Sequence, residues 1–120
     1  LSLMLKTFMN TKEIWWVTFN PSVGAEINKK RPAIIVNDDA IGILPLRIIV
    51  PITDWNERYI TADWMVKIKP TTLNKLGKDS TADCFQVKSL STNRFVSKLG
   101  EMDEIDFQKI KESLKIVFDL

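Results

Sequence analysis

An arginine and a threonine flank two apolar segments of the chain, in positions that suit a phosphate-binding site. Arg31 precedes the apolar run 33–36, and Thr53 follows the apolar run 46–52. A guanidinium matches two phosphate oxygens and stays charged at any physiological pH, and a threonine hydroxyl can position the same group. Two plainer interpretations remain: a surface arginine paired with a loop carboxylate, and a threonine that serves only a turn.

Three further side chains near these two could take part in chemistry or binding. Glu26 lies five residues before Arg31 in a polar loop, where it could act as a general base or, as we rather expect, orient the arginine. Trp15 and Trp16 are adjacent, so they should face opposite sides of a strand. We expect one of them to enter the core and the other to stack on a base or close a subunit interface.

The chain has no histidine and a single cysteine, Cys84. This excludes a Ser-His-Asp triad and the usual zinc sites. A carboxylate magnesium site would need a dense acidic cluster, and the first 100 residues hold none, so we expect neither metal nor cofactor. We interpret Cys84 as an inert, apolar residue of a strand. A chain without a disulfide framework suits the reducing cytosol, which predicts a cytoplasmic protein.

Length and composition indicate one domain over residues 1–120, with residues 1–11 as a flexible or irregular N-terminal segment. The 120 residues are 45% hydrophobic, and no apolar run approaches the 18 residues of a membrane span. The net charge of +2 is weakly basic, but the cations cluster, with Lys29, Lys30 and Arg31 contiguous. This clustering fits an ordinary solvated surface as well as a nucleic-acid site.

The apolar periodicity predicts a mainly β protein with a C-terminal helix, an α+β fold built on a small, twisted, barrel-like antiparallel sheet. Segments rich in β-branched and aromatic residues indicate strands at 13–19, 33–36, 46–52, 61–69, 81–89 and 95–99, the last ended by Gly100. Asp103 is the expected N-cap of the helix. The apolar stripe of this helix has the spacing of one helix face and comprises Phe107, Ile110, Leu114 and Val117.

Three stretches of the chain resemble the MazF/PemK toxin family: EIWWVTFNPSVGAEINKKRPAIIV, then IIVPIT, then CFQVKSLSTNRFVSKLGEM. The resemblance runs from Glu13 to the end of the chain. It implies an SH3-like barrel, a homodimer, and the toxin of a type II toxin–antitoxin pair that cuts single-stranded RNA without a metal. It also implies a cognate antitoxin whose acidic, disordered tail folds on binding and blocks the RNA groove.

The same resemblance assigns roles to individual residues. The family's catalytic arginine and threonine fall on Arg31 and Thr53, and a loop glutamate of some members falls on Glu26. The implied reaction is attack of the RNA's own 2′-hydroxyl on the adjacent phosphate, which leaves a 2′,3′-cyclic phosphate and a 5′-hydroxyl. Further residues expected to bind the substrate are Trp16, Lys29, Lys30, Asp54, Gln86 and Lys88.

The chain also departs from the family pattern. Relatives often have glycine where Lys12 and Lys29 stand, and PemK-like members have a proposed base, an aspartate, at the position of Phe85. Asp54 stands where small polar residues are common, and it could be a base or a hindrance. Two alternatives to a ribonuclease therefore stay open: a toxin of the same fold that blocks a protein such as gyrase, and a non-catalytic binding module.

Overall fold

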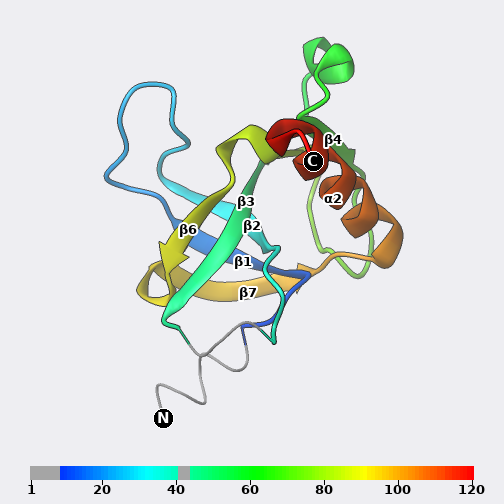
Figure 1. The fold of residues 1–120 in the computed structure, drawn as a ribbon. Coiled ribbons are helices and arrows are strands. Elements are labelled where there is room, and N and C mark those ends of the chain that lie inside the picture. Colours follow the sequence, from blue (N-terminus) through cyan, green and yellow to red (C-terminus); the bar gives the residue numbers. More distant parts are fainter. Residues whose placement is uncertain (1–8, 41–43) are drawn as a thin grey trace.

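The computed structural model describes residues 9–40 and 44–120, which form a curved seven-stranded sheet and a C-terminal helix (Figure 1). The strands are β1 (Glu13–Thr18), β2 (Lys30–Ile35), β3 (Leu46–Asp54), β4 (Met65–Ile68), β5 (Ser80–Asp83), β6 (Lys88–Ser91) and β7 (Phe95–Glu101). Three 3-10 helices and one α-helix complete the fold: η1 (Glu57–Thr61), η2 (Cys84–Gln86), η3 (Thr92–Arg94) and α2 (Glu104–Phe118).

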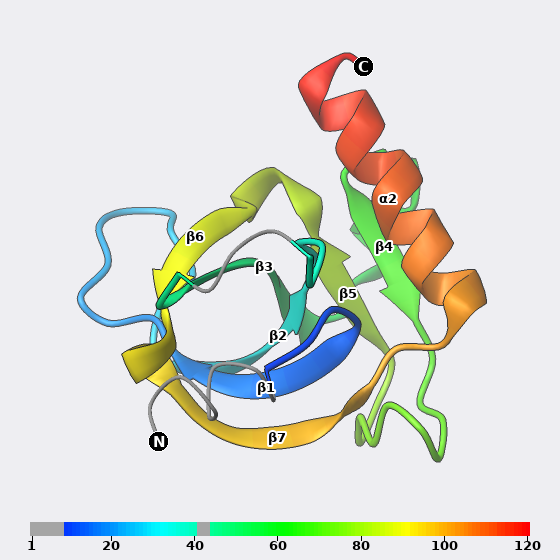
Figure 2. The ribbon, with the colours of Figure 1, turned by 60° about the horizontal axis from the view of Figure 1, so that its bottom comes forward.

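The sheet is antiparallel throughout, in the order β4-β5-β3-β2-β1-β7, with β6 paired to β3. β3 is the long central strand: its first half pairs with β6, its middle with β2 and its last three residues with β5. Because β3 changes partner along its length, the strands curl into a barrel-like ring, which Figure 2 shows end on. The ring is not closed, since within the described residues β6 and β7 are not paired. The predicted α+β class is confirmed.

Both faces of the central strands are buried, which explains why they read as continuous apolar runs rather than alternating ones. Neighbouring residues Ile34 and Ile35 on β2 are fully buried in two different clusters. Ile34 belongs to the cluster that packs against α2, together with Phe107 and Ile110. Ile35 belongs to the second cluster, together with Phe95 of β7.

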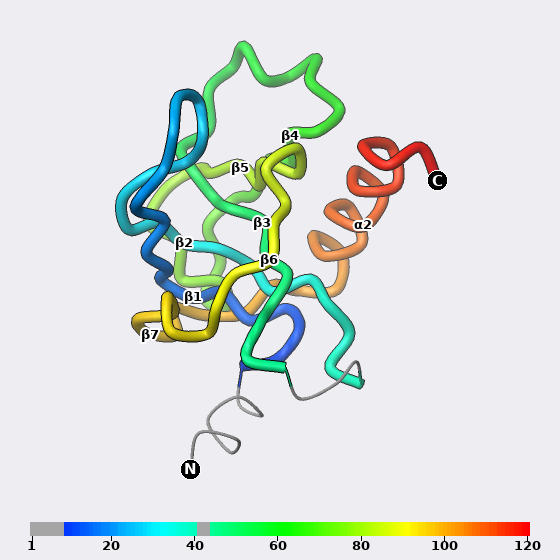
Figure 3. Tube along the Cα trace, turned by 60° about the vertical axis from the view of Figure 1, so that its left-hand side comes forward, coloured from blue at the N-terminus to red at the C-terminus, as the bar shows by residue number. Residues whose placement is uncertain are grey.

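The predicted C-terminal helix and its N-cap are confirmed. The Asp103 carboxylate accepts a hydrogen bond from the Asp106 backbone N–H at 2.8 Å, and Phe107 and Ile110 are buried. The helix lies against β4 and η2 (Figures 1 and 3). Among residues 9–40 and 44–120, no helix combines the length and the apolar character that crossing a bilayer needs.

Three of the predicted strands were wrong in part. The segment 81–89 is interrupted by η2, because the Asp83 side chain accepts a hydrogen bond from Phe85 N–H and caps a 3-10 turn. In the segment 61–69 only Met65–Ile68 forms a strand, because Thr61 still belongs to η1 and residues 63–64 form a turn. β7 also continues through Gly100 to Glu101 instead of ending at the glycine.

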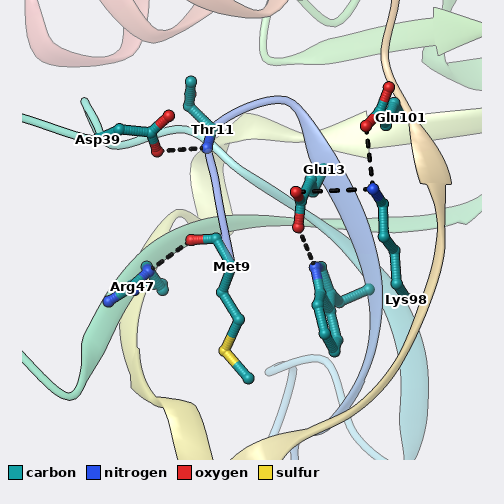
Figure 4. A network of polar contacts seen from close by, with 8 residues as sticks. Met9, Thr11, Glu13, Asp39, Arg47, Lys98 and Glu101 are labelled. Atoms are coloured by element: carbon teal, nitrogen blue, oxygen red, sulfur yellow. Dashed lines mark hydrogen bonds and ion pairs between the residues drawn. The ribbon is translucent and has the colours of Figure 1, made fainter. Parts of the chain in front are cut away.

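Polar contacts fix the start of β1 (Figure 4). The buried Glu13 carboxylate accepts a hydrogen bond from Trp15 Nε1 at 2.8 Å and lies 3.6 Å from Lys98 Nζ. Lys98 Nζ also donates a hydrogen bond to the Glu101 carboxylate at 2.9 Å, and this hydrogen bond is the main cause of the raised pKa of Lys98. Thr11 N–H donates to Asp39 at 2.7 Å, so the described part of the N-terminal segment is held to the barrel.

Candidate active site

Five of the residues that the sequence predicted at a functional site line one hollow of about 360 Å³. They are Trp16 of β1, Lys30 and Arg31 of β2, and Thr53 and Asp54 of β3. Residues of the loop between β4 and β5 also line the hollow. Apolar side chains contribute to its lining, among them Ile52 and Leu76. We refer to this space as the cationic hollow.

Strand pairing explains why Arg31 and Thr53 line the same hollow. Ala33 of β2 is paired with Pro51 of β3 in an antiparallel ladder. Counting two residues outward along both strands leads to Arg31 on one and Thr53 on the other. The β2–β3 ladder itself ends at Ala33 and Pro51, and Arg31 and Thr53 lie two residues beyond it, where β2 pairs with β1 and β3 pairs with β5. Both residues line the cationic hollow.

The guanidinium of Arg31 has no hydrogen-bond or ion-pair partner among the described residues. Within the described residues Arg31 makes no ion pair, and its Nε is buried without a hydrogen-bond acceptor. A buried donor left unsatisfied costs about 1–3 kcal/mol, so the site favours any ligand that brings an acceptor. The expected orienting contact from Glu26 is absent, because that carboxylate instead accepts a hydrogen bond from Val23 N–H at 3.0 Å.

The neighbouring groups complete the electrostatics of the hollow. The Thr53 hydroxyl has no hydrogen bond to any other described residue, so it is free to bind a ligand. Asp54, which the sequence left as a base or a hindrance, is paired with Lys78 at 3.1 Å, and this pairing offsets its charge. Lys30 lies over Trp16, with Nζ 5.6 Å from the ring centroid.

Sequence reasoning missed Lys75 and Lys78 as part of this site. Both line the cationic hollow from the β4–β5 loop. Their charge was visible in the sequence, but they lie more than 40 positions from Arg31. No motif or spacing links the two segments, and only the folding of the loop against β7 brings them together.

The other predicted residues lie elsewhere. Glu26, Gln86 and Lys88 line a separate hollow of about 240 Å³. The Gln86 side chain accepts a hydrogen bond from Ile27 N–H at 2.7 Å and donates one to Asp83 at 2.9 Å. In the described structure it therefore acts as a clamp between the β1–β2 loop and η2.

Backbone geometry accounts for two of the departures from the family pattern. Lys12 and Lys29 have φ angles of 72° and 64°. This left-handed region favours glycine, because it brings a Cβ atom close to backbone atoms. Glycine would adopt these turns without strain, and here lysine adopts them instead. Lys29 lines neither of the two hollows.

The remaining reactive groups offer no other chemistry nearby. In the part of the chain that the structure describes, no three His, Cys, Asp or Glu side chains come together as a metal site would require. Cys84 is buried in η2, not in a strand as expected, and burial raises the pKa of its thiol to about 11. A thiol with this pKa carries little thiolate at neutral pH and is a poor nucleophile.

A family model and a relative of known activity both match this chain, and they indicate the same protein family. Residues 10–118 match the family model of PemK-like, MazF-like toxins of type II toxin–antitoxin systems. The chain is 29% identical over 118 residues to the endoribonuclease MazF9 of Mycobacterium tuberculosis, an alignment that covers 93% of this chain and 98% of the relative.

Solved structures agree on the fold. MazF from Deinococcus radiodurans superposes with a TM-score of 0.77 at 20% identity, over 92% of this chain and 96% of that one. A mycobacterial endoribonuclease solved in complex with its cognate antitoxin superposes with a TM-score of 0.72 at 16% identity, over 92% and 95% of the two chains.

Proposed function

Since this chain belongs to the family of PemK-like, MazF-like toxins of type II toxin–antitoxin systems, we propose that it is an endoribonuclease that cuts single-stranded RNA in the cationic hollow. The observation that carries the proposal is Arg31, which lines the hollow and whose buried Nε has no hydrogen-bond partner in the part of the chain that the structure describes. Named endoribonucleases among its relatives support the same activity.

In this mechanism the 2′-hydroxyl of the RNA attacks the adjacent phosphorus, and the 5′-oxygen of the next nucleotide leaves. The products are a 2′,3′-cyclic phosphate and a 5′-hydroxyl. Negative charge grows on the phosphoryl oxygens in the five-coordinate transition state. Arg31 stabilises that charge with its fixed donors, and the Thr53 hydroxyl holds a phosphate oxygen in position. Single-stranded RNA suits this reaction because its backbone can turn to bring the attacking oxygen in line.

Other residues of the predicted site bind the RNA on either side of the reacting phosphate. Trp16 offers a half-buried ring on which a base can stack. Lys30 and Lys29 add positive charge on β2 and just before it. Glu26, Gln86 and Lys88 lie in the separate hollow, which suits contact with nucleotides away from the reacting one.

The partners follow from the same proposal. We infer a homodimer, supported by Leu46 and Ile48, which are 45% and 44% exposed on the same side of β3. An antitoxin with an acidic, disordered tail would bind in the cationic hollow and exclude RNA from it. Relatives crystallised with their antitoxins support this partner. A toxin that acts on cellular RNA would work in the cytoplasm.

The test is incubation of the purified protein with single-stranded RNA in excess EDTA. We expect cleavage that leaves 2′,3′-cyclic phosphate ends. The Arg31→Ala variant should lose about 10²–10³-fold in kcat, the usual effect of removing one donor to a developing oxyanion. Arg31→Lys should also be impaired, because lysine keeps the charge but not the fork of donors.

Matched variants separate chemistry from folding. Thr53→Val removes the hydroxyl and keeps the shape, whereas Thr53→Ser keeps the hydroxyl and should retain more activity. Arg58→Ala removes an exposed arginine of η1 that lies outside the hollow, and it should cleave like the unchanged protein. Intact RNA, or full activity in Arg31→Ala, would refute the proposal.

A further inference from the structure

We propose that Lys75 is a second phosphate-binding residue, which holds a phosphodiester of the same RNA strand next to the one that reacts. This inference rests on the proposed function of the cationic hollow. It concerns a residue of the β4–β5 loop that none of the sequence patterns singled out.

The charge balance of the hollow leaves Lys75 available. Its described lining holds four cationic residues and one carboxylate, Asp54. Lys78 is paired with that carboxylate at 3.1 Å, and Lys30 lies over an aromatic ring. Lys75 forms no ion pair with any described residue and is exposed. Its ammonium group is therefore free to neutralise a phosphate.

The position of Lys75 fits a flanking phosphate. Besides the cationic hollow, Lys75 lines a neighbouring hollow of about 320 Å³, which is also lined by Leu73 of its loop and Lys98 of β7. The cation of that second hollow, Lys98, is already paired with Glu101 and Glu13. An RNA strand that leaves the reaction site in this direction would pass over Lys75. Among the described residues that line the second hollow, Lys75 is the only cation without an ion pair.

The loop is built to hold Lys75 in place. Asn74, only 1% exposed, accepts hydrogen bonds from Thr71 N–H at 2.9 Å and Leu76 N–H at 3.0 Å. Its amide also donates to Lys69 C=O at 2.9 Å. Lys75 itself has a φ of 56°, which a lysine adopts only when its surroundings impose it. Such support reduces the ordering cost of binding a ligand.

Contact with β7 anchors this loop near Arg31. Glu101 N–H donates to Leu73 C=O at 3.1 Å. The backbone of Leu73 and Asn74 lies so close to Gly100 that a Cβ there would be 2.6 Å from both carbonyl oxygens. The close approach requires glycine, and it places the loop cations beside the strand ends that carry Arg31 and Thr53.

The test measures binding without cleavage. A 2′-O-methyl RNA oligonucleotide of mixed sequence has no free 2′-hydroxyl, so it can bind but cannot react. Its affinity is measured by fluorescence anisotropy over a range of salt concentrations for the unchanged protein, Lys75→Gln and Lys69→Gln. Lys69 is the matched control, an exposed lysine of the same loop region that lies outside the hollow.

One phosphate contact on a single strand contributes about 0.7 to the slope of log K against log salt concentration. We expect the slope of Lys75→Gln to fall by about this amount, that of Lys69→Gln to stay unchanged, and Lys75→Arg to restore it. In cleavage of unprotected RNA, Lys75→Gln should raise KM and leave kcat nearly unchanged. Equal slopes for all variants, an equal loss in Lys69→Gln, or no binding by the unchanged protein would overturn the inference.

The two proposals fail in different ways. If the unchanged protein cleaves RNA but Lys75→Gln keeps its salt slope and its KM, the flanking site is refuted and the nuclease stands. If the protein binds the oligonucleotide with a Lys75-dependent slope but leaves unprotected RNA intact, the nuclease is refuted and the phosphate site stands.

Discussion

Replacing Gly100 by alanine should disrupt the wall of the cationic hollow. A Cβ at this position would lie 2.6 Å from the carbonyl oxygens of Leu73 and Asn74, whereas ordinary contact begins at 3.4 Å. The loop backbone must therefore retreat by about 0.8 Å. Neither oxygen belongs to a flexible side chain, so the strain cannot be relieved by a rotamer change.

The cost follows from two effects. Overpacking of a well-packed site costs about 1–3 kcal/mol, and the hydrogen bond from Glu101 N–H to Leu73 C=O contributes about 1 kcal/mol if it is lost. We expect Gly100→Ala to lower the free energy of unfolding by about 2–4 kcal/mol. Urea denaturation followed by tryptophan fluorescence measures this change directly.

Gly77→Ala is the control in the same loop. Nothing lies within 4 Å of a Cβ at Gly77, and its φ is not in the left-handed region. This variant should match the unchanged protein or gain about 0.4–1 kcal/mol through a less flexible unfolded state. The folded fraction of Gly100→Ala should also bind RNA with a weaker salt dependence, since Lys75 moves with the loop. A Gly100→Ala protein as stable as Gly77→Ala would refute the reasoning.

Four further outcomes are expected. Asp54→Asn releases Lys78, so it should tighten binding of the 2′-O-methyl oligonucleotide and steepen its salt slope by about 0.7; a 100-fold fall in kcat would instead identify Asp54 as the proton acceptor. Lys29→Gly should raise the free energy of unfolding by up to about 1 kcal/mol, because glycine adopts the φ of 64° without strain, and a loss of stability would contradict this. Burial and the neighbouring Asp103 raise the pKa of Asp106, so the stability from this carboxyl is present at low pH and is lost as pH rises through its native pKa. Asp106→Asn should therefore stabilise the protein at pH 7, with a gain in urea denaturation that disappears near pH 3. Finally, the Cys84 thiol, with a pKa of about 11, should resist a thiol reagent at pH 8 in the native protein and react once urea unfolds it; rapid labelling of the native state would show that it is accessible.

Much of the fold could be predicted from the sequence because it depends on local patterns. β-branched and aromatic runs mark β1, β3 and β7. The carboxylate of Asp103 and the apolar stripe from Phe107 mark the start and the buried face of α2. The errors fall where side-chain hydrogen bonds override such patterns: Asp83 caps a 3-10 turn within a stretch that otherwise has the composition of a strand.

The sequence alone determined which residues could handle a phosphate, because a guanidinium and a hydroxyl beside apolar strands are visible as residue types. It could not determine which of them meet. The pairing of β2 with β3 brings the ends that carry Arg31 and Thr53 to one hollow. The contact of the β4–β5 loop with Gly100 brings Lys75 and Lys78 to the same hollow, and Glu26 lines another. Strand pairing and loop packing join segments far apart in the chain, and the free energy of those contacts depends on the whole fold rather than on any local pattern.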